Sequence, residues 1–127
     1  MKKYIFSGLT AGVLGGMIID LIFINLAGPS ALFTIIGITE RINVFISHAV
    51  LGGILGIIFT VLVRKLPRLN IWLAGILWGL VCLGVIGGIP SFFVKLVNPL
   101  TALFGFIVWL IYGLILAAAM KFFSQKV

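Results

Sequence analysis

Long apolar runs separated by short polar stretches set the pattern of this chain of 127 residues. A helix needs about 20 mostly apolar residues to cross a bilayer, and four runs approach or exceed that length: residues 4–27, 43–63, 71–89 and 100–122. Pro29 follows the first run and Pro90 ends the third, and proline cannot continue an interior helical hydrogen-bond ladder. The pattern predicts an all-α membrane protein with four transmembrane helices.

The composition supports one integral membrane domain spanning residues 1–127. Hydrophobic residues make up 63% of the chain and charged residues only 9%, which leaves too little polar surface for a water-soluble domain. The loops are too short to hold a soluble catalytic domain. The sequence contains no phosphate-binding loop, HExxH or CxxC motif. We therefore expect no enzyme activity, no metal site and no cofactor.

The net charge of +7 is unevenly distributed along the chain. Of the nine Lys and Arg residues, only Arg41 and Lys95 fall between the first and second runs or between the third and fourth. The other seven precede the first run, separate the second from the third, or follow the fourth: Lys2, Lys3, Arg64, Lys65, Arg68, Lys121 and Lys126. Cytoplasmic loops carry such an excess, so we predict cytoplasmic N- and C-termini. Cations spread between apolar runs do not indicate nucleic-acid binding.

Small residues recur every fourth position in the first two runs and so share one helix face. Membrane helices pack closely through such faces. In an antiparallel hairpin, one register matches the two stripes position by position: Gly8 with Thr60, Gly12 with Gly56, Gly16 with Gly52, and Asp20 with His48. The sequence therefore predicts that these glycines mediate helix packing and that the pair Asp20 and His48 meets.

The second pair of runs follows the same rule, and residues 73–79 also resemble residues 10–16. The corresponding register gives the pairs Gly75 with Gly113, Gly79 with Trp109, and Leu83 with Gly105. We therefore predict two antiparallel hairpins that arose by internal duplication. Four further glycines are left over for packing against a partner: Gly15, Gly53, Gly84 and Gly88.

Asp20 and His48 form the candidate polar site. An ionised aspartate at the centre of a membrane helix costs about 2.5–3.5 kcal/mol on insertion scales, so a partner should offset that cost. The pair could fix the hairpin register by a hydrogen bond, relay protons or bind a cation, or ligate a metal or haem. A single histidine with no second ligand motif argues against the metal. Further polar residues cluster at the same outer end: Asn25, Asn43, Lys95 and Asn98.

Short motifs complete the pattern, with Trp78-Gly79-Leu80 in the third run and Tyr112-Gly113-Leu114 in the fourth. Together with the glycine-striped first run and the histidine that opens the second, they resemble uncharacterised bacterial four-span inner-membrane proteins built from two similar helical hairpins. That family often has a second histidine opening the fourth span, where this chain has Phe104 and Gly105. The resemblance implies the fold and an inner-membrane location, but no activity.

Two function classes follow from these features. The first is an accessory or assembly subunit that packs against a larger membrane protein through glycine-rich helix faces. The second is a small transporter or channel that acts as a homo-oligomer and uses the membrane-embedded pair of Asp20 and His48. The first predicts small-residue faces beyond those used internally, and the second predicts a water-accessible Asp20. In both cases the lipid bilayer is a partner.

Overall fold

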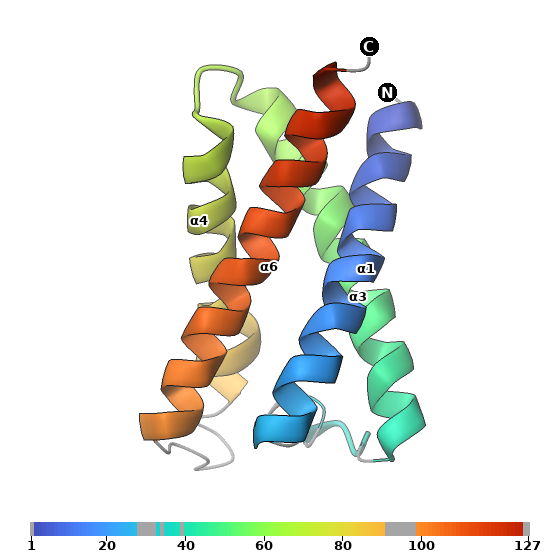
Figure 1. Ribbon diagram of the computed structural model, residues 1–127, viewed down its shortest axis with the longest axis vertical. Coiled ribbons are helices and arrows are strands. Elements are labelled where there is room, and N and C mark those ends of the chain that lie inside the picture. The colour runs from blue at the N-terminus through green and yellow to red at the C-terminus, as the bar shows by residue number, and fades with distance from the viewer. Residues whose placement is uncertain (1, 28–32, 34, 39, 91–98, 126–127) are drawn as a thin grey trace.

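The protein is a bundle of helices in our computed structural model, which describes residues 2–27, 33, 35–38, 40–90 and 99–125 (Figure 1). The third apolar run is divided between an α-helix and the π-helix η1. In chain order the elements are α1 (Lys2–Ala27), α3 (Arg41–Lys65), α4 (Ile71–Cys82), η1 (Leu83–Gly88) and α6 (Pro99–Gln125). Both ends of the chain lie at the same end of the bundle as the connection between α3 and α4.

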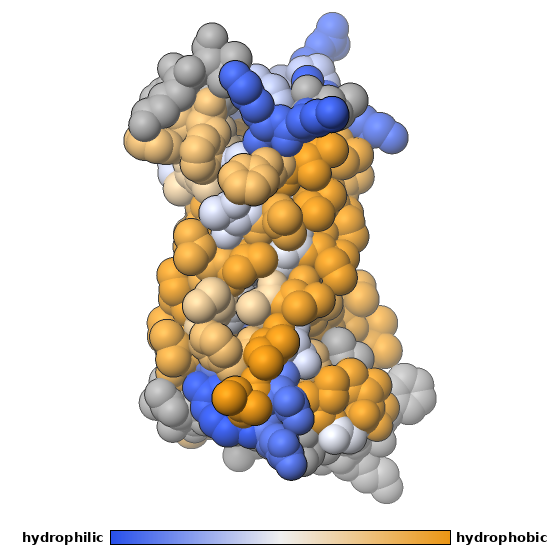
Figure 2. Space-filling view, turned by 90° about the vertical axis from the view of Figure 1, so that its right-hand side faces the viewer, coloured by the Kyte–Doolittle hydropathy of each residue, from blue (hydrophilic) through white to orange (hydrophobic). Residues whose placement is uncertain are grey.

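The prediction of an all-helical protein with four apolar spans is confirmed within the described residues. Their stretches that are long and apolar enough to cross a membrane are Lys2–Ile22, Arg41–Lys65, Ile71–Gly88 and Ala102–Phe123. Figure 2 shows a broad apolar band between two hydrophilic ends. Many large apolar side chains in this band are exposed, as expected for helices that face lipid. These features indicate a multi-pass membrane protein.

Local sequence explains where the helices begin and end. Asn70 caps α4, because its side-chain oxygen accepts hydrogen bonds from the backbone N–H of Trp72 at 2.9 Å and of Leu73 at 3.4 Å. The helix α3 ends at Lys65, two residues before Pro67, which cannot continue a helical ladder. Pro99 is the first residue of α6, where its missing N–H has no helical partner to lose.

The helices α1 and α3 pack backbone to backbone through glycine. A Cβ atom on Gly12 would collide with the carbonyl oxygen of Gly52, and one on Gly16 would collide with that of His48. A Cβ atom on Gly8 would strike the hydroxyl of Thr60. Membrane helices gain little from apolar burial against each other, so this close van der Waals approach is a main source of their association.

The helices α4 and α6 use the same device over only part of their length. Cβ atoms on Gly75 and Gly113 would each collide with the other residue's carbonyl oxygen, and one on Gly79 would collide with that of Trp109. The next pair of the sequence register, Leu83 with Gly105, is also in contact, but through the side chain of Leu83 and not through backbone. A Cβ atom on Gly105 would stand 3.8 Å from Cδ1 of Leu83, an ordinary van der Waals distance. The close approach ends where the backbone widens into η1.

Tyr112 joins α6 to the first two helices. Its ring lies where a Cβ atom on Gly15 would stand, and its hydroxyl donates a hydrogen bond of 2.7 Å to the carbonyl oxygen of Gly52. Gly53 is also used internally, because Leu9 and Val13 of α1 fill the space beside it. Gly15 and Gly53 are therefore not left over for a partner, contrary to the sequence-based expectation.

The glycines should differ sharply in their tolerance of a methyl group. We expect Gly12→Ala to lower the free energy of unfolding by about 1–3 kcal/mol, because the new Cβ atom overlaps backbone that cannot rotate away. Gly84→Ala is the matched control, since no described atom lies within 4 Å of its Cβ position. It should leave stability unchanged or raise it by up to about 1 kcal/mol. Reversible unfolding in mixed detergent micelles would measure the free energy of unfolding of both variants. Equal losses of stability in the two variants would contradict the close contact of α1 with α3 at Gly12.

Candidate functional site

Asp20 is completely buried, with 0% of its surface exposed. Its Oδ1 atom lies 2.8 Å from Nδ1 of His48, and its Oδ2 atom accepts a hydrogen bond of 2.5 Å from Nη1 of Arg41. Both carboxylate oxygens therefore have a partner on α3. A buried charge that is paired and hydrogen-bonded costs far less than an isolated one.

His48 faces α1 from the second turn of α3. The imidazole is 6% exposed, and its ring lies edge-on to that of Phe33 with centroids 4.5 Å apart and an interplanar angle of 72°. Since an ionised carboxylate can only accept hydrogen bonds, Nδ1 must carry the proton shared with Asp20. This bond fixes the ring orientation, and Phe33 packs against one side.

Arg41 connects the buried carboxylate to the edge of the bundle. Its side chain is 48% exposed, and its guanidinium also lies 6.0 Å from the ring centroid of Phe45. Arg41 is the first residue of α3, directly after Glu40. The guanidinium supplies the formal positive charge that balances Asp20, while its exposed part remains at the polar end of the helix.

The glycine contacts explain why these side chains meet. His48, Gly52 and Gly56 lie on one face of α3, and their opposite neighbours on α1 are glycines. Because the backbones touch, the short side chain of Asp20 can reach an imidazole on the neighbouring helix. The sequence register thus matches the observed contacts at Gly8 with Thr60 and at Asp20 with His48.

The predicted outer polar cluster is only partly described. The Nδ2 atom of Asn43 donates a hydrogen bond of 3.2 Å to Glu40, and both residues are exposed. Asn25 lies in the last turns of α1. Lys95 and Asn98 lie outside the described residues. The contact of Asn43 is therefore a local one with Glu40, at the start of α3.

The described residues do not form a metal-binding group. None of their histidine, cysteine, aspartate and glutamate side chains assemble in threes. Asp20 already uses one oxygen for Arg41 and the other for His48, which leaves a single imidazole nitrogen as a ligand. The arrangement is a charge-neutral hydrogen-bonded cluster that can hold two helices in one register, or pass a proton between imidazole and carboxylate.

Sequence reasoning missed two members of this cluster. On the sequence alone, Arg41 is interpreted only as a cation between the first two runs, although it precedes His48 by seven residues, or two helical turns, and so shares its face. That spacing was the available indication. Phe33 comes from the short apolar stretch between the first two spans, and nothing in its spacing relates it to His48.

Comparison of the chain with protein-family models, curated proteins and solved structures found no match. Among the described residues, the chain is characterised by its four long apolar helical stretches and by the hydrogen-bonded cluster of buried Asp20 and His48 with half-exposed Arg41.

Removing Arg41 alone should destabilise the protein more than removing the charges of both Arg41 and Asp20. We expect Arg41→Gln to lower the free energy of unfolding by about 1.5–3 kcal/mol, because a buried carboxylate loses a charged hydrogen-bond donor. The double variant Arg41→Gln with Asp20→Asn should be more stable than Arg41→Gln alone, since the uncompensated charge is gone. Arg68→Gln, at the opposite end, serves as the control. Simple additivity of the two changes would show that the pair is not energetically coupled.

Proposed function

We propose that this protein is an accessory or assembly subunit that packs against a transmembrane helix of a larger membrane protein. In this proposal it lies in a bacterial inner membrane as two similar, duplicated hairpins, with both termini in the cytoplasm. The resemblance to four-span inner-membrane proteins and the distribution of Lys and Arg support the location and orientation. The contacts at Gly12 with Gly52 and Gly75 with Gly113 support the duplication.

The proposed role rests on two exposed glycines in η1. Gly84 and Gly88 of η1 are both exposed and are spaced as in the small-xxx-small motif of membrane helix interfaces. No described atom lies within 4 Å of a Cβ position on Gly84. Exposed apolar residues flank the two glycines at Val81, Val85 and Ile89. This exposed face of α4 and η1 is defined here as the η1 face.

The η1 face contrasts with the other glycine stripes of the chain. The stripes on α1 and α3, and Gly75 and Gly113 on α4 and α6, meet backbone of a neighbouring helix within the bundle. Glycine within a helix lowers its stability by about 0.5–1 kcal/mol relative to alanine. Contact with lipid does not require the close approach that the absence of a side chain allows. A second backbone packed against Gly84 and Gly88 would offset that cost.

A photoreactive residue should report the partner at the η1 face. We expect a probe at Val85, which is 59% exposed, to cross-link to one protein in native membranes. The matched control is a probe at Val50 of α3, which is 56% exposed and should react mainly with lipid. Gly84→Leu should abolish the Val85 cross-link without lowering stability, because the added side chain blocks only the outer face. Equal protein cross-linking from both probes would refute the proposal.

A transporter or channel is the second candidate, and the Arg41–Asp20–His48 cluster favours it. The cluster runs from a half-exposed guanidinium through a buried carboxylate to a buried imidazole, and ionisable side chains within a membrane often mark ion or proton pathways. In this case the chain would act as a homo-oligomer. Proton or cation flux into liposomes should then fall strongly in Asp20→Asn, while the purified variant keeps its helical content and oligomeric mass.

The mass of the gently extracted complex separates the two candidates. A stoichiometric foreign chain would support the accessory role, whereas a homo-oligomer would support the transporter. The cross-linking result at Val85 gives the same distinction independently, because the attached protein is either a different chain or a second copy.

A further inference from the structure

Phe33 is buried although it lies between the first two membrane-spanning stretches and not within them. Its side chain is 3% exposed, whereas Ile35 and Ile36 of the same short segment are exposed. The segment lies at the end of the bundle where α3 begins (Figure 1). It therefore turns one aromatic side chain inward and leaves its neighbouring aliphatic side chains on the outside.

A tight turn fixes the backbone of Phe33. The backbone N–H of Ile38 donates a hydrogen bond of 2.8 Å to the carbonyl oxygen of Phe33. Gly37 has a φ of 78°, which is the left-handed conformation. A hydrogen bond across six residues with glycine in this conformation is the Schellman motif, which ends helices. Since side chains with a Cβ atom rarely adopt such a φ, Gly37 allows the turn that holds Phe33 in place.

The ring of Phe33 lies directly on the imidazole of His48. The ring centroids are 4.5 Å apart, which is at the short end of the range of about 4.5–7 Å for aromatic pairs. No water molecule fits between two rings at this separation. The imidazole is 6% exposed, so Phe33 contributes to its cover on the side away from Asp20.

The polar cluster thus has two covers of different chemistry. Arg41 covers the carboxylate of Asp20 with a charged donor, and Phe33 covers the imidazole of His48 with an apolar ring. Because Nδ1 carries the proton of the hydrogen bond to Asp20, Nε2 keeps the lone pair that accepts a proton. An aromatic ring offers no group that exchanges protons with this nitrogen, so water reaches Nε2 past Phe33 only when the ring moves.

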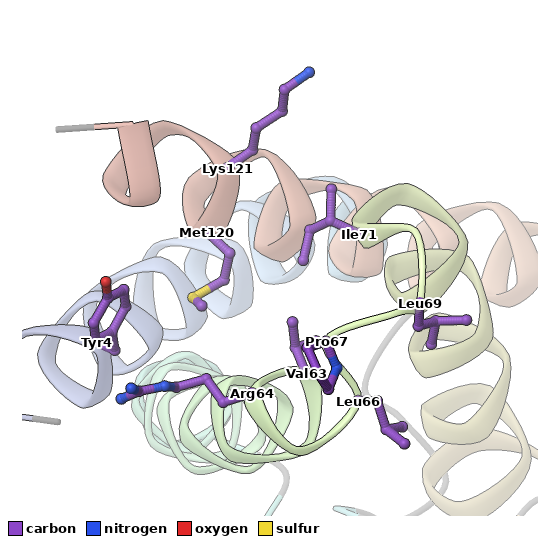
Figure 3. Close-up of a pocket in the computed structure, with 9 residues that line it drawn as sticks. All are labelled: Tyr4, Val63, Arg64, Leu66, Pro67, Leu69, Ile71, Met120 and Lys121. Carbon is purple, nitrogen blue, oxygen red and sulfur yellow. The ribbon is translucent and has the colours of Figure 1, made fainter. Parts of the chain in front are cut away.

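The far end of the bundle offers no comparable approach to His48. A cavity of about 350 Å³ lies there, lined among others by Tyr4, Arg64 and Met120 (Figure 3), and none of the cluster residues lines it. Between this cavity and His48 the backbones of α1 and α3 touch at their glycines. Water therefore cannot pass from the cavity to the imidazole along the contact of these two helices.

We propose that Phe33 is a hydrophobic gate that closes the Asp20–His48 pair at the end of the bundle where α3 begins, and that the turn at Gly37 holds this gate shut. Displacement of the ring opens Nε2 of His48 to water and protons. The gate goes beyond the accessory role, which depends on the η1 face. Its failure would leave that role untouched.

The test measures access to the imidazole by chemical modification. Diethyl pyrocarbonate acylates neutral imidazole nitrogen, and His48 is the only histidine of the chain, so the ultraviolet absorbance of the acylated ring reports one residue. The purified full-length chain in neutral micelles is compared with an unstructured histidine peptide. Rates are taken at the alkaline plateau, where every imidazole is neutral, so that a difference in rate reflects access and not protonation.

Phe33→Ala should raise the rate about tenfold or more, because the cover loses the burial of a large aromatic side chain. Phe33→Leu fills part of the space and should give a smaller increase. Ile36→Ala is the matched control, since Ile36 belongs to the same segment but is exposed. It should change the rate less than about twofold.

The turn is tested by two substitutions at Gly37. Gly37→Ala should raise the rate about threefold or more, because alanine disfavours a positive φ. No described atom lies within 4 Å of a Cβ position on Gly37, so the effect is not a collision. Gly37→Asn should stay close to the wild-type rate, since asparagine tolerates the left-handed conformation. Equal rates in these two variants would refute the role of the turn.

A destabilised variant separates opening of the gate from general loosening of the bundle. Gly75→Ala places a Cβ atom against the carbonyl oxygen of Gly113, in the other pair of helices, and should lower stability without raising the rate. Equal increases in Phe33→Ala and Gly75→Ala would overturn the gate. If Phe33→Ala does not fold, Phe33→Leu and the wild type still decide. A wild-type rate equal to that of the free peptide, or an unchanged rate in Phe33→Leu, would refute the proposal.

Discussion

Backbone contact between α1 and α3 is the constraint on which the candidate site depends. Gly12 and Gly16 bring α1 against the carbonyl groups of Gly52 and His48, a distance that any side chain would prevent. Aspartate has one of the shortest charged side chains, so Asp20 reaches His48 only because the two backbones touch. The glycine stripe therefore both contributes to the packing of this helix pair and aligns the polar groups near the end of the bundle where α3 begins.

The two halves of the chain show what the polar cluster adds to this packing. In the second pair of helices, the predicted register places Leu83 and Gly105 where the first pair has Asp20 and His48, and Leu83 is the first residue of η1. Backbone contact between α4 and α6 thus gives way at Gly105 to contact with the side chain of Leu83. Between α1 and α3, the hydrogen bonds of Asp20 with His48 and Arg41 join the two helices beyond Gly16, the last glycine of the stripe.

Much of the fold and part of the site could be predicted from sequence, because both follow periodic patterns. Apolar runs define spans, and a four-residue glycine period defines a face, so the contact of Asp20 with His48 follows from one register. The ring of Tyr112 against Gly15 did not follow, because contacts between α1 and α6 depend on how the two pairs of helices pack together. The π-helix was also missed, since the sequence of η1 reads as an ordinary continuation of α4.

The charged residues are distributed unevenly between the two ends of the bundle. Arg41 pairs with Asp20 within the bundle, and Glu40 directly precedes Arg41, so the described charges of these three residues sum to −1. Of the described cations, Lys2, Lys3, Arg64, Lys65, Arg68 and Lys121 lie toward the other end of the bundle. Such a distribution orients a membrane protein and also attracts anionic headgroups to the same surface. The buried carboxylate of Asp20 therefore does not alter the difference in charge between the two ends, because Arg41 neutralises it.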